Sequence, residues 1–334
     1  MQLEKNKTVL VTGGAGFIGS HLVDELGDLE IVVLDDFSTG TRENLAHLID
    51  RENIRIVDGD IRDPETVKSC LEDCQVVFHL ACRGVRHSIG HPVESHDVNA
   101  GGTLNLLQEA RAAGVKRFIH ISTSEVYGTA RMAPMDENHT CFPETVYGAA
   151  KLAGEAYARA YCRTYGFPTV VVRPFNNFGP RSHFEGDSGE VIPRFCVWAL
   201  NKQRPIIFGD GTQTRDFIFV RETAYWLRRI TTIDGLVGDT INLGSGSETS
   251  VRKLAEIVYR LAGVPELEPD LQAPRPGDVH RLLANASRAK EFLDFSARVT
   301  LEDGISQLLD HLRGQSSDPT ELLGMVQARN WVDS

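Results

Sequence analysis

The sequence predicts an α/β fold with a doubly wound parallel sheet, and two observations carry this prediction. Short runs that are nearly continuous in apolar residues recur along the first half of the chain, as strands buried on both faces do: TVLVTG, EIVVLDD, IRIVDGD, VVFHLAC, RFIHIS and TVVVRPF. Amphipathic segments fill the gaps, for example NAGGTLNLLQEARAAGV and GAAKLAGEAYARAYCRTYG, and each meets a glycine-containing stop before the next strand. Strands and helices that alternate at this spacing indicate right-handed crossovers and a Rossmann-type sheet.

The composition bounds the classes of function. A net charge of -11 over 334 residues makes a nucleic acid or an anionic membrane unfavourable as the main partner, so an anionic ligand must be met by a few placed cations. The six cysteines show no CxxC spacing, which predicts a reducing compartment and no metal site. No apolar run approaches the ~18 residues of a membrane span, and no leader pattern precedes the first strand. We expect a soluble, cytoplasmic protein.

The segment VLVTGGAGFIGSHL places Gly13, Gly16 and Gly19 between an apolar strand and an amphipathic helix. Glycines there permit a tight turn, close approach of the backbone to a pyrophosphate and close helix packing, with the helix N-terminus facing the anion. Asp35 ends the next strand, where a carboxylate can hold the adenosine ribose hydroxyls and repel a 2′-phosphate. The motif therefore predicts an NAD site. Asp60, after the third strand, is either an adenine contact or a solvated turn residue.

Tyr147 and Lys151 stand four residues apart in ETVYGAAK and so share one helix face. A nearby ammonium lowers the pKa of a phenol, which lets a tyrosine act as a general base near neutral pH. A lone YxxxK is more often an exposed pair. Here it follows a strand that ends in the polar run Ser122, Thr123, Ser124 and Glu125.

Together these features resemble the extended short-chain dehydrogenase/reductase superfamily, in particular its NAD-dependent nucleotide-sugar epimerases and dehydratases. The resemblance spans residues 7–312 and rests on TGGAGFIGSHL, FHLA, VNAGGTLNLL, RPFNNFGPR, GDGTQTRDFIFV, NLGSG and RPGDV. It implies NAD as cofactor, a nucleoside-diphosphate sugar as substrate and a shared first step. In that step Tyr147 takes the proton of the sugar C4 hydroxyl, Thr123 hydrogen-bonds the same oxygen and Lys151 orients the nicotinamide ribose, while hydride leaves C4 and a 4-keto sugar forms.

The resemblance also implies the residues that contact each ligand. The expected cofactor contacts are Gly13, Gly16, Phe17, Ile18, Gly19, Asp35, Asp36, Asp60, Ile61, Leu80, Ala81, Asn99, Tyr147 and Lys151. The expected substrate contacts are Arg86, Asn176, Arg181, Val191, Arg215, Arg275 and Asp278. Among the latter, Arg215 and Arg275 would supply the cations that a diphosphate needs in an otherwise acidic protein.

The triplet Thr123, Ser124 and Glu125 bears on what happens after the ketone forms. A 4,6-dehydratase removes the C5 proton and expels the C6 hydroxyl; Glu125 would be its base, with Ser124 where many dehydratases carry an aspartate acid. The triplet equally resembles that of UDP-glucuronate decarboxylases, and GVRHSIGHP, with Arg86, resembles glucuronate 4-epimerases. We favour an NDP-sugar 4,6-dehydratase. A UDP-glucuronate decarboxylase, an NDP-sugar C4-epimerase and a catalytically silent NAD-binding protein stay open.

The rhythm of strands and helices changes after about residue 180, at the polar, glycine-rich loop GPRSHFEGDSGE. We expect residues 1–180 to form the NAD-binding domain with the catalytic residues, and residues 181–312 to form mainly a smaller α/β lobe that binds the nucleotide sugar. Residues 313–334 would be a polar and then weakly helical tail. The resemblance further implies a homodimer through the helices that begin near Asn99 and Tyr147.

Overall fold

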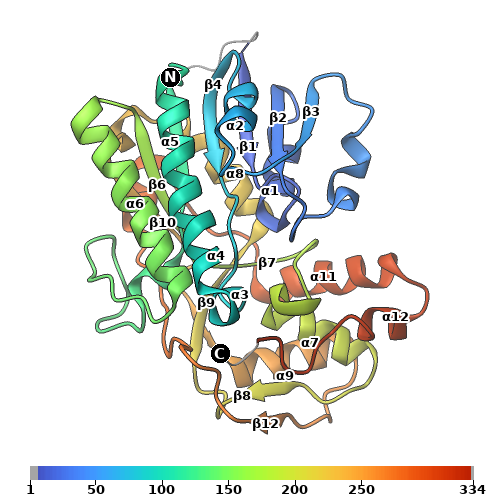
Figure 1. The fold of residues 1–334 in the computed structure, drawn as a ribbon. Coiled ribbons are helices and arrows are strands. Elements are labelled where there is room, and N and C mark those ends of the chain that lie inside the picture. The colour runs from blue at the N-terminus through green and yellow to red at the C-terminus, as the bar shows by residue number, and fades with distance from the viewer. Residues whose placement is uncertain (1–6, 332–334) are drawn as a thin grey trace.

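The computed structural model describes residues 7–331 and contains one large parallel sheet (Figure 1). Its seven strands lie in the order β10-β6-β5-β4-β1-β2-β3, and every neighbouring pair is parallel. The strands are β1 (Thr8–Thr12), β2 (Glu30–Asp35), β3 (Ile54–Asp58), β4 (Cys74–His79), β5 (Arg117–Ile121), β6 (Thr169–Pro174) and β10 (Thr240–Leu243). The six strands expected from the sequence are therefore confirmed. The strand order reverses between β1 and β4, and the crevice at such a switch point is where ligands bind in sheets of this kind.

Helices cover both faces of the sheet, and strand residues alternate between two apolar cores. In β1, Val9 and Val11 enter one core while Leu10 enters the other. The first core is closed by α1 (Phe17–Glu25), η1 (Arg42–Leu48), α8 (Val220–Ile230) and α10 (Ser287–Leu293). The second is closed by α2 (Pro64–Cys70), η2 (Asp97–Gly102), α5 (Thr103–Ala112) and α6 (Val146–Tyr165). Burial on both faces explains why these strands are almost uninterrupted in apolar residues.

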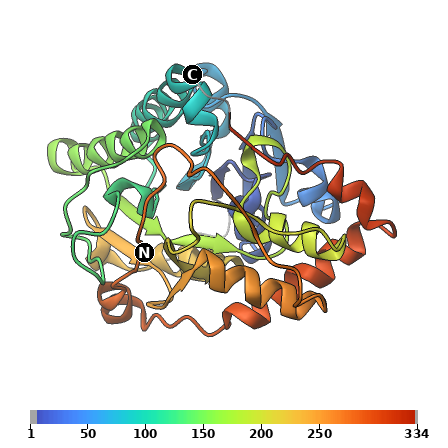
Figure 2. The same ribbon diagram turned by 90° about the horizontal axis from the view of Figure 1, so that it is seen from below.

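The smaller lobe lies beyond the carboxyl edge of the large sheet (Figures 1 and 2). It contains a three-stranded sheet of β7 (Asn176–Phe178), β9 (Thr214–Phe219) and β11 (Glu248–Ser250), and a two-stranded sheet of β8 (Ile206–Phe208) and β12 (Asp270–Gln272). Its helices are α7 (Val191–Leu200), α9 (Val251–Ala262), α11 (Leu301–Gln315) and α12 (Pro319–Leu323). They share a separate core with aromatic side chains of β7 and β9.

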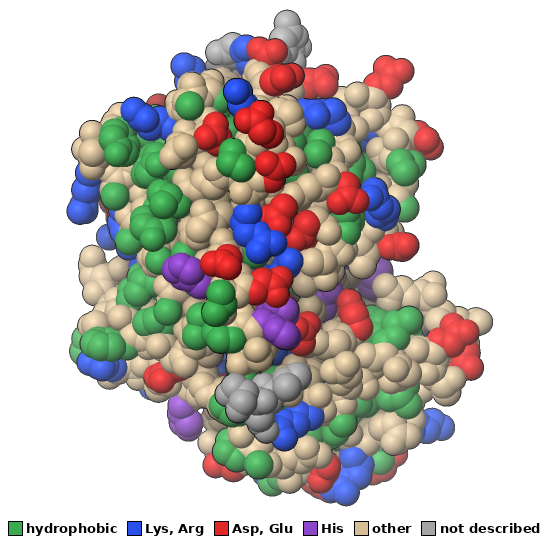
Figure 3. Space-filling view, viewed as in Figure 1, with side chains coloured by type: hydrophobic (Ala, Val, Ile, Leu, Met, Phe, Trp, Pro, Cys, Tyr) green, Lys and Arg blue, Asp and Glu red, His purple; other side chains and the backbone are tan. Residues whose placement is uncertain are grey.

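Several short helices lie between the longer elements. They are α3 (His87–Gly90), α4 (Pro92–His96), η3 (Ser124–Tyr127), η4 (Gly186–Ser188) and η5 (Asp234–Leu236). Figure 3 shows acidic, basic and histidine side chains intermixed on the surface where the large sheet meets the lobe. At this junction His87 of α3 contacts Asp187 of η4, with 2.8 Å between Nδ1 and Oδ2.

The expected domain boundary at residue 180 needs correction. The chain enters the lobe after β6 but returns to the large sheet for β10, which pairs with β6 in the register Thr240↔Val171. Helix α8 packs against α1, and α10 closes the same core. Residues 220–243 and 287–293 therefore belong to the domain of the large sheet, because their apolar side chains are buried in its core. Across residues 7–331, none of the helices combines the length and the apolar character that a bilayer span requires.

Candidate functional site

The glycine-rich turn forms the junction of β1 and α1 at the switch point. Gly13 has φ +70°, and its N–H donates to Leu34 O at 2.8 Å. A Cβ at Gly13 would stand 2.7 Å from Ala81 N, and one at Gly19 would stand 2.0 Å from Gly13 O. Neither position can carry a side chain, so glycine there lets the turn pack closely against Leu80 and Ala81 and lets α1 pack closely against the turn. This is the arrangement of turns that hold a pyrophosphate at a helix N-terminus.

Asp35 ends β2 beside this turn, as the sequence predicts. Its carboxylate is 6% exposed and accepts hydrogen bonds from Ala15 N at 2.8 Å and Phe37 N at 2.9 Å. Burial raises the pKa of Asp35, although the two backbone donors oppose the shift. Each carboxylate oxygen has a further lone pair, so the group can hold ribose hydroxyls as well as the turn. The neighbouring Asp36 forms an ion pair with Arg83 at 3.0 Å.

We define the cofactor pocket as the cavity that runs from this turn to Lys151. All but one of the residues expected to contact NAD line it: Gly13, Gly16, Phe17, Ile18, Gly19, Asp35, Asp36, Asp60, Ile61, Leu80, Ala81, Tyr147 and Lys151. Asn99 is the exception. Its side chain is 1% exposed and bonds to Arg83 N at 2.8 Å and to Arg83 O at 3.0 Å. Asn99 therefore does not line the cofactor pocket itself. It holds the backbone of Arg83, which does.

Helix α6 brings Tyr147 and Lys151 to the edge of the sheet. Thr145 caps the helix by accepting the Gly148 N–H at 3.2 Å, which fixes where the first turn begins. Lys151 is 1% exposed, and its ammonium donates to Ile121 O, at the end of β5, at 2.6 Å. Burial lowers the pKa of Lys151. The ammonium is thus held in one place between the sheet and the cofactor pocket.

The phenol of Tyr147 faces an acidic neighbourhood. Burial raises the pKa of Tyr147 well above its ordinary value, Glu125 and Glu190 raise it further, and a hydrogen bond with Thr123 opposes them. A neutral phenol is therefore the resting form. To act as a base, Tyr147 needs a cationic group close by. Lys151, four residues further along α6, is the candidate that the sequence predicts.

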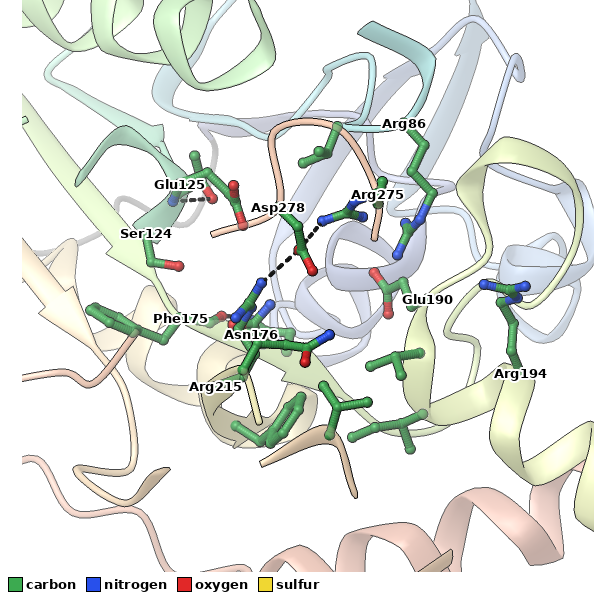
Figure 4. Close-up of a pocket in the computed structure, with 18 of the residues that line it drawn as sticks. Arg86, Ser124, Glu125, Phe175, Asn176, Glu190, Arg194, Arg215, Arg275 and Asp278 are labelled. Carbon is green, nitrogen blue, oxygen red and sulfur yellow. Dashed lines mark hydrogen bonds and ion pairs between the residues drawn. The ribbon is translucent and has the colours of Figure 1, made fainter. Parts of the chain in front are cut away.

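The turn η3 carries the polar run that the sequence singled out. Thr123 caps it, because Thr123 Oγ1 accepts the Glu125 N–H at 3.2 Å. Glu125 is 8% exposed, and its Oε2 has no hydrogen-bond partner within residues 7–331. Figure 4 shows Ser124 and Glu125 entering a second cavity, the substrate pocket, which Thr123 and Tyr147 also line. A buried carboxylate oxygen without a donor is an acceptor prepared for a ligand.

Arginines from four segments converge on the same pocket. Arg215 Nη2 and Arg275 Nη2 both bind Asp278 Oδ1, at 2.9 and 2.6 Å, so one carboxylate serves two guanidinium groups (Figure 4). Burial lowers the pKa of Arg86 to about 9, and Arg275 and Arg194 contribute to this shift. Like charges gathered in this way are stabilised by an anionic ligand, and a diphosphate has the matching charge and geometry. Asn176 and Val191 line the pocket as expected.

Arg181 is the substrate candidate that the structure does not bring to either pocket. The chain turns at this residue with φ +64°, and Arg181 Nη1 binds Asp24 Oδ2 on α1 at 2.8 Å. The expectation that Arg181 contacts the substrate is corrected accordingly, because a nearby carboxylate on the outer side of α1 holds the guanidinium. His183, from the same loop, lines the cofactor pocket and pairs with Glu185 at 2.9 Å.

Two charged residues of the substrate pocket, Glu190 and Arg194, were not expected from the sequence. Glu190 precedes α7 and lines both pockets, and burial raises its pKa to about 7. Arg194, one turn into α7, is 5% exposed, and burial lowers its pKa to about 10. Both stand at the start of an apolar helix, where no local pattern distinguishes them from surface charges.

Comparison with known proteins identifies the family. The family model described as GDP-mannose 4,6 dehydratase matches residues 10–308. The chain belongs to this family. The resemblance to the extended short-chain dehydrogenases/reductases and the predicted fold class are thereby confirmed. The matched range contains the whole cofactor pocket and all of the substrate pocket except Asn330 and Trp331.

Individual relatives carry out different reactions. The chain is 35% identical over 320 residues to the putative UDP-glucose 4-epimerase of Methanocaldococcus jannaschii, covering 92% of this chain and 99% of that protein. It is 32% identical to UDP-glucuronic acid decarboxylase 1 of Arabidopsis thaliana, covering 96% and 73%. It is similar to DesIV, a dTDP-glucose 4,6-dehydratase from Streptomyces venezuelae solved with NAD and TYD bound, at a TM-score of 0.87 and 32% identity, covering 92% and 97%. At the level of the family, the prediction of NAD as cofactor is confirmed.

Proposed function

We propose that the protein is an NAD-dependent nucleotide-sugar 4,6-dehydratase. The observation that carries the proposal is Glu125, a buried carboxylate with an unsatisfied oxygen in the substrate pocket that Tyr147 also lines. Oxidation at C4 needs Tyr147, Thr123 and Lys151 but makes no use of a carboxylate at this position. A second base beside the sugar is what an elimination requires.

The first step is oxidation of the sugar at C4. Tyr147 removes the proton of the C4 hydroxyl, and the Thr123 hydroxyl hydrogen-bonds the same oxygen. Lys151, fixed on Ile121 O at 2.6 Å, orients the nicotinamide ribose and favours the phenolate of Tyr147. Bound in this pocket, NAD would supply the hydride acceptor for the oxidation at C4 and the hydride donor for the later reduction. The fit of the cofactor pocket to NAD rests on the turn at Gly13, which side chains cannot enter, and on the carboxylate of Asp35.

The second step is elimination across C5 and C6. The C4 ketone acidifies the C5 proton, and Glu125 removes it. The C6 hydroxyl then leaves with a proton supplied by the protonated Glu125 or through Ser124, so the sugar loses one water molecule. Uptake of hydride at C6, together with transfer to C5 of the proton that Tyr147 took from the C4 hydroxyl, gives a 4-keto-6-deoxy sugar and restores Tyr147. Glu125 therefore serves as a base and then as an acid, which suits a carboxylate that lies out of bulk water.

Charge in the pocket favours a neutral sugar over a uronate. Glu125 and Glu190 both act on the phenol of Tyr147, and two carboxylates there disfavour a third on the substrate. Arg86, the cation expected to meet a uronate, lies with Glu190 and Arg194 on the side of the pocket opposite Glu125 (Figure 4). This arrangement supports a dehydratase in preference to a UDP-glucuronate decarboxylase.

An NDP-sugar C4-epimerase is the second candidate. It is supported by the similarity to the putative UDP-glucose 4-epimerase of Methanocaldococcus jannaschii across nearly the full length of both chains. In that case Glu125 would have no chemical role and would serve only the turn η3.

The mass of the product separates these reactions. The purified protein with NAD is incubated with dTDP-glucose, GDP-mannose, UDP-GlcNAc and UDP-glucuronate, and the sugar products are analysed by mass spectrometry. The proposal predicts loss of one water from one of the first three. Loss of carbon dioxide from UDP-glucuronate would identify a decarboxylase, and an isomer of unchanged mass an epimerase. No binding of any nucleotide sugar would support a catalytically silent NAD-binding protein.

We also propose a homodimer formed through α5 and α6. Both helices leave large apolar side chains at the surface, including Leu104 at 38%, Val146 at 40% and Tyr165 at 54% exposure. Exposed apolar groups on neighbouring helices are typical of an association surface. Light scattering that gives the mass of a single chain at micromolar concentration would contradict this proposal.

A further inference from the structure

The C-terminal tail lies outside the family match, which ends at residue 308. After α11 the tail forms α12, where Leu322 is 6% exposed and packs into the core of the lobe. The dark red chain in Figure 1 then leaves α12 and runs back toward the middle of the molecule. Residues 327–329 are exposed, whereas Asn330 and Trp331 are 1% and 7% exposed. At Asn330 and Trp331 the tail is therefore buried in the protein.

Side chains at the start of α7 hold this segment in place. Arg194 Nη2 donates to Gln327 O and to Ala328 O, each at 2.9 Å. Asn330 Nδ2 donates to Gly189 O at 2.8 Å, and Asn330 Oδ1 lies 3.4 Å from Arg194 Nη1. Arg194 also lines the substrate pocket. The tail thus fixes the orientation of a pocket cation that has no carboxylate partner among the contacts of the described chain.

Trp331 and Phe208 meet at the lobe end of the substrate pocket. Their rings make an edge-to-face contact with centroids 4.5 Å apart, and both residues line the pocket. Phe208 ends β8 in the lobe, whereas Glu125 and Tyr147 lie at the edge of the large sheet. The arginine cluster of Arg215 and Arg275 also lines this cavity, which therefore runs from the catalytic groups to a pair of aromatic rings.

The indole N–H of Trp331 is buried and has no hydrogen-bond partner in the part of the chain that is described. Buried donors are almost always paired, so an unpaired one in a pocket wall indicates that a ligand supplies the acceptor. A flat aromatic surface beside a single N–H donor matches a nucleobase, which is planar and carries carbonyl oxygens at its edge. An aromatic residue next to cations that suit a diphosphate has the chemistry of a nucleoside diphosphate site.

We propose that Gln327–Trp331 builds the nucleobase end of the substrate site. Trp331 contacts the base through its ring and its N–H, and Asn330 and Arg194 act as positioning residues that hold the segment against the pocket. The inference rests on the proposed nucleotide-sugar substrate and extends it, because it assigns nucleobase binding to residues outside the matched range of the family.

Calorimetric titration of the full chain with UDP, GDP and dTDP tests the proposal, with NAD titrated in parallel as a measure of intact folding. Trp331→Ala should weaken the tightest of the three nucleoside diphosphates by about tenfold or more, since it removes an aromatic contact and a hydrogen bond. Trp331→Phe should lose less, because it keeps the ring, and Asn330→Ala should weaken binding although Trp331 is present. The NAD affinity should not change in any of them. Met325→Ala is the matched control, since Met325 is 55% exposed on the same C-terminal tail, just before the segment, and does not line the pocket.

Equal affinity of the wild-type protein and Trp331→Ala for the nucleoside diphosphates would overturn the inference while leaving the proposed function intact. Tighter binding by Trp331→Ala would also overturn it, because the tail would then obstruct the base site instead of forming it. If the wild-type protein binds NAD but none of the three nucleoside diphosphates, the proposed function fails and the inference fails with it.

Discussion

Thr123 and Glu125 are joined by a hydrogen bond, in which the Glu125 N–H donates to Thr123 Oγ1 at 3.2 Å. The bond caps η3 at the end of β5 and fixes both side chains at the wall of the substrate pocket. The residue proposed to serve C4 oxidation and the residue proposed to serve elimination therefore stand on one turn.

Replacement of Tyr147 by phenylalanine should reduce kcat by about 10²- to 10⁴-fold, the usual contribution of a general base. The affinity for NAD should stay the same, because the ring that lines the cofactor pocket is retained. Quenched product assays measure kcat, and titration with NAD measures the affinity for the cofactor. Tyr161→Phe is the control, since Tyr161 lies on the same helix and packs against the core. Unchanged turnover in Tyr147→Phe would refute the assigned base.

The buried carboxyl of Glu190 predicts a pH dependence of substrate binding. Burial raises the pKa of Glu190 to about 7, although His183 and Arg86 lower it. The group is neutral below that pH and becomes an anion in the substrate pocket above it, where it repels a diphosphate. We expect KM for the nucleotide sugar to rise severalfold between about pH 6 and about pH 8. Steady-state kinetics of Glu190→Gln should show a flatter KM profile, and a profile identical to that of the wild type would contradict the assignment.

Arg275 should contribute strongly to nucleotide-sugar affinity. It shares Asp278 with Arg215, and its Nε is buried with no partner in the described residues. Arg275→Ala removes a charge-assisted contact, so the Kd for the nucleotide sugar should rise about 10- to 100-fold. Arg281→Ala serves as the control, because Arg281 is an exposed residue paired with Glu248. If both variants bind equally well in calorimetry, Arg275 does not contact the diphosphate.

A buried ion pair behind the site should dominate acid stability. Glu155 is 0% exposed, and its Oε2 lies 2.6 Å from Arg173 Nη2 and 3.0 Å from Arg159 Nη1. Removing the carboxylate leaves Arg173 buried without its partner, so Glu155→Gln should lower the free energy of unfolding by about 3–5 kcal/mol near neutral pH. Urea denaturation measures this loss. Glu291→Gln, at an exposed position of α10, should have little effect.

The sign of the pH effect follows from the pKa of Glu155. Burial alone would raise this pKa, but the hydrogen bond and charge of Arg173 hold it below the ordinary value of 4.5. The ion pair therefore stabilises the fold at pH values above about 4.5, and the contribution disappears as the pH falls through the lowered pKa. The difference in unfolding free energy between the wild type and Glu155→Gln should shrink on acidification. A difference that is constant with pH would contradict this explanation.

The sequence predicts most of the sheet and the cofactor pocket, because both depend on local patterns. Strands buried on two faces are continuous in apolar residues, and the turn at Gly13 admits no side chain, so each leaves a signal within a few residues. Tyr147 and Lys151 share a face because of helix periodicity alone. Arg215, Arg275 and Asp278 were expected only through family resemblance, since they meet by the folding of distant segments.

The remaining features depend on tertiary contacts that no local pattern encodes. Arg181 has the residue type of a substrate contact, but its backbone conformation turns it toward Asp24. The strand β10 (Thr240–Leu243) returns to the large sheet from within the expected lobe, because β6 offers it a free edge. Glu190 and Trp331 enter the pocket from segments that appear polar or irregular in the sequence.

The role of Glu125 is tested most directly by a single-turnover experiment that compares the wild-type protein with Glu125→Gln. NAD-loaded enzyme in excess is mixed with its nucleotide-sugar substrate, and reduced cofactor is followed by absorbance while product mass is followed by mass spectrometry. If the protein is a dehydratase, the wild type should release a product that is lighter by one water molecule. Little reduced cofactor should accumulate during this turnover. Glu125→Gln should oxidise C4 and stop there, so that reduced cofactor and 4-keto sugar accumulate without loss of water. Turnover by Glu125→Gln at the wild-type rate, with a product of unchanged mass from both proteins, would contradict the account.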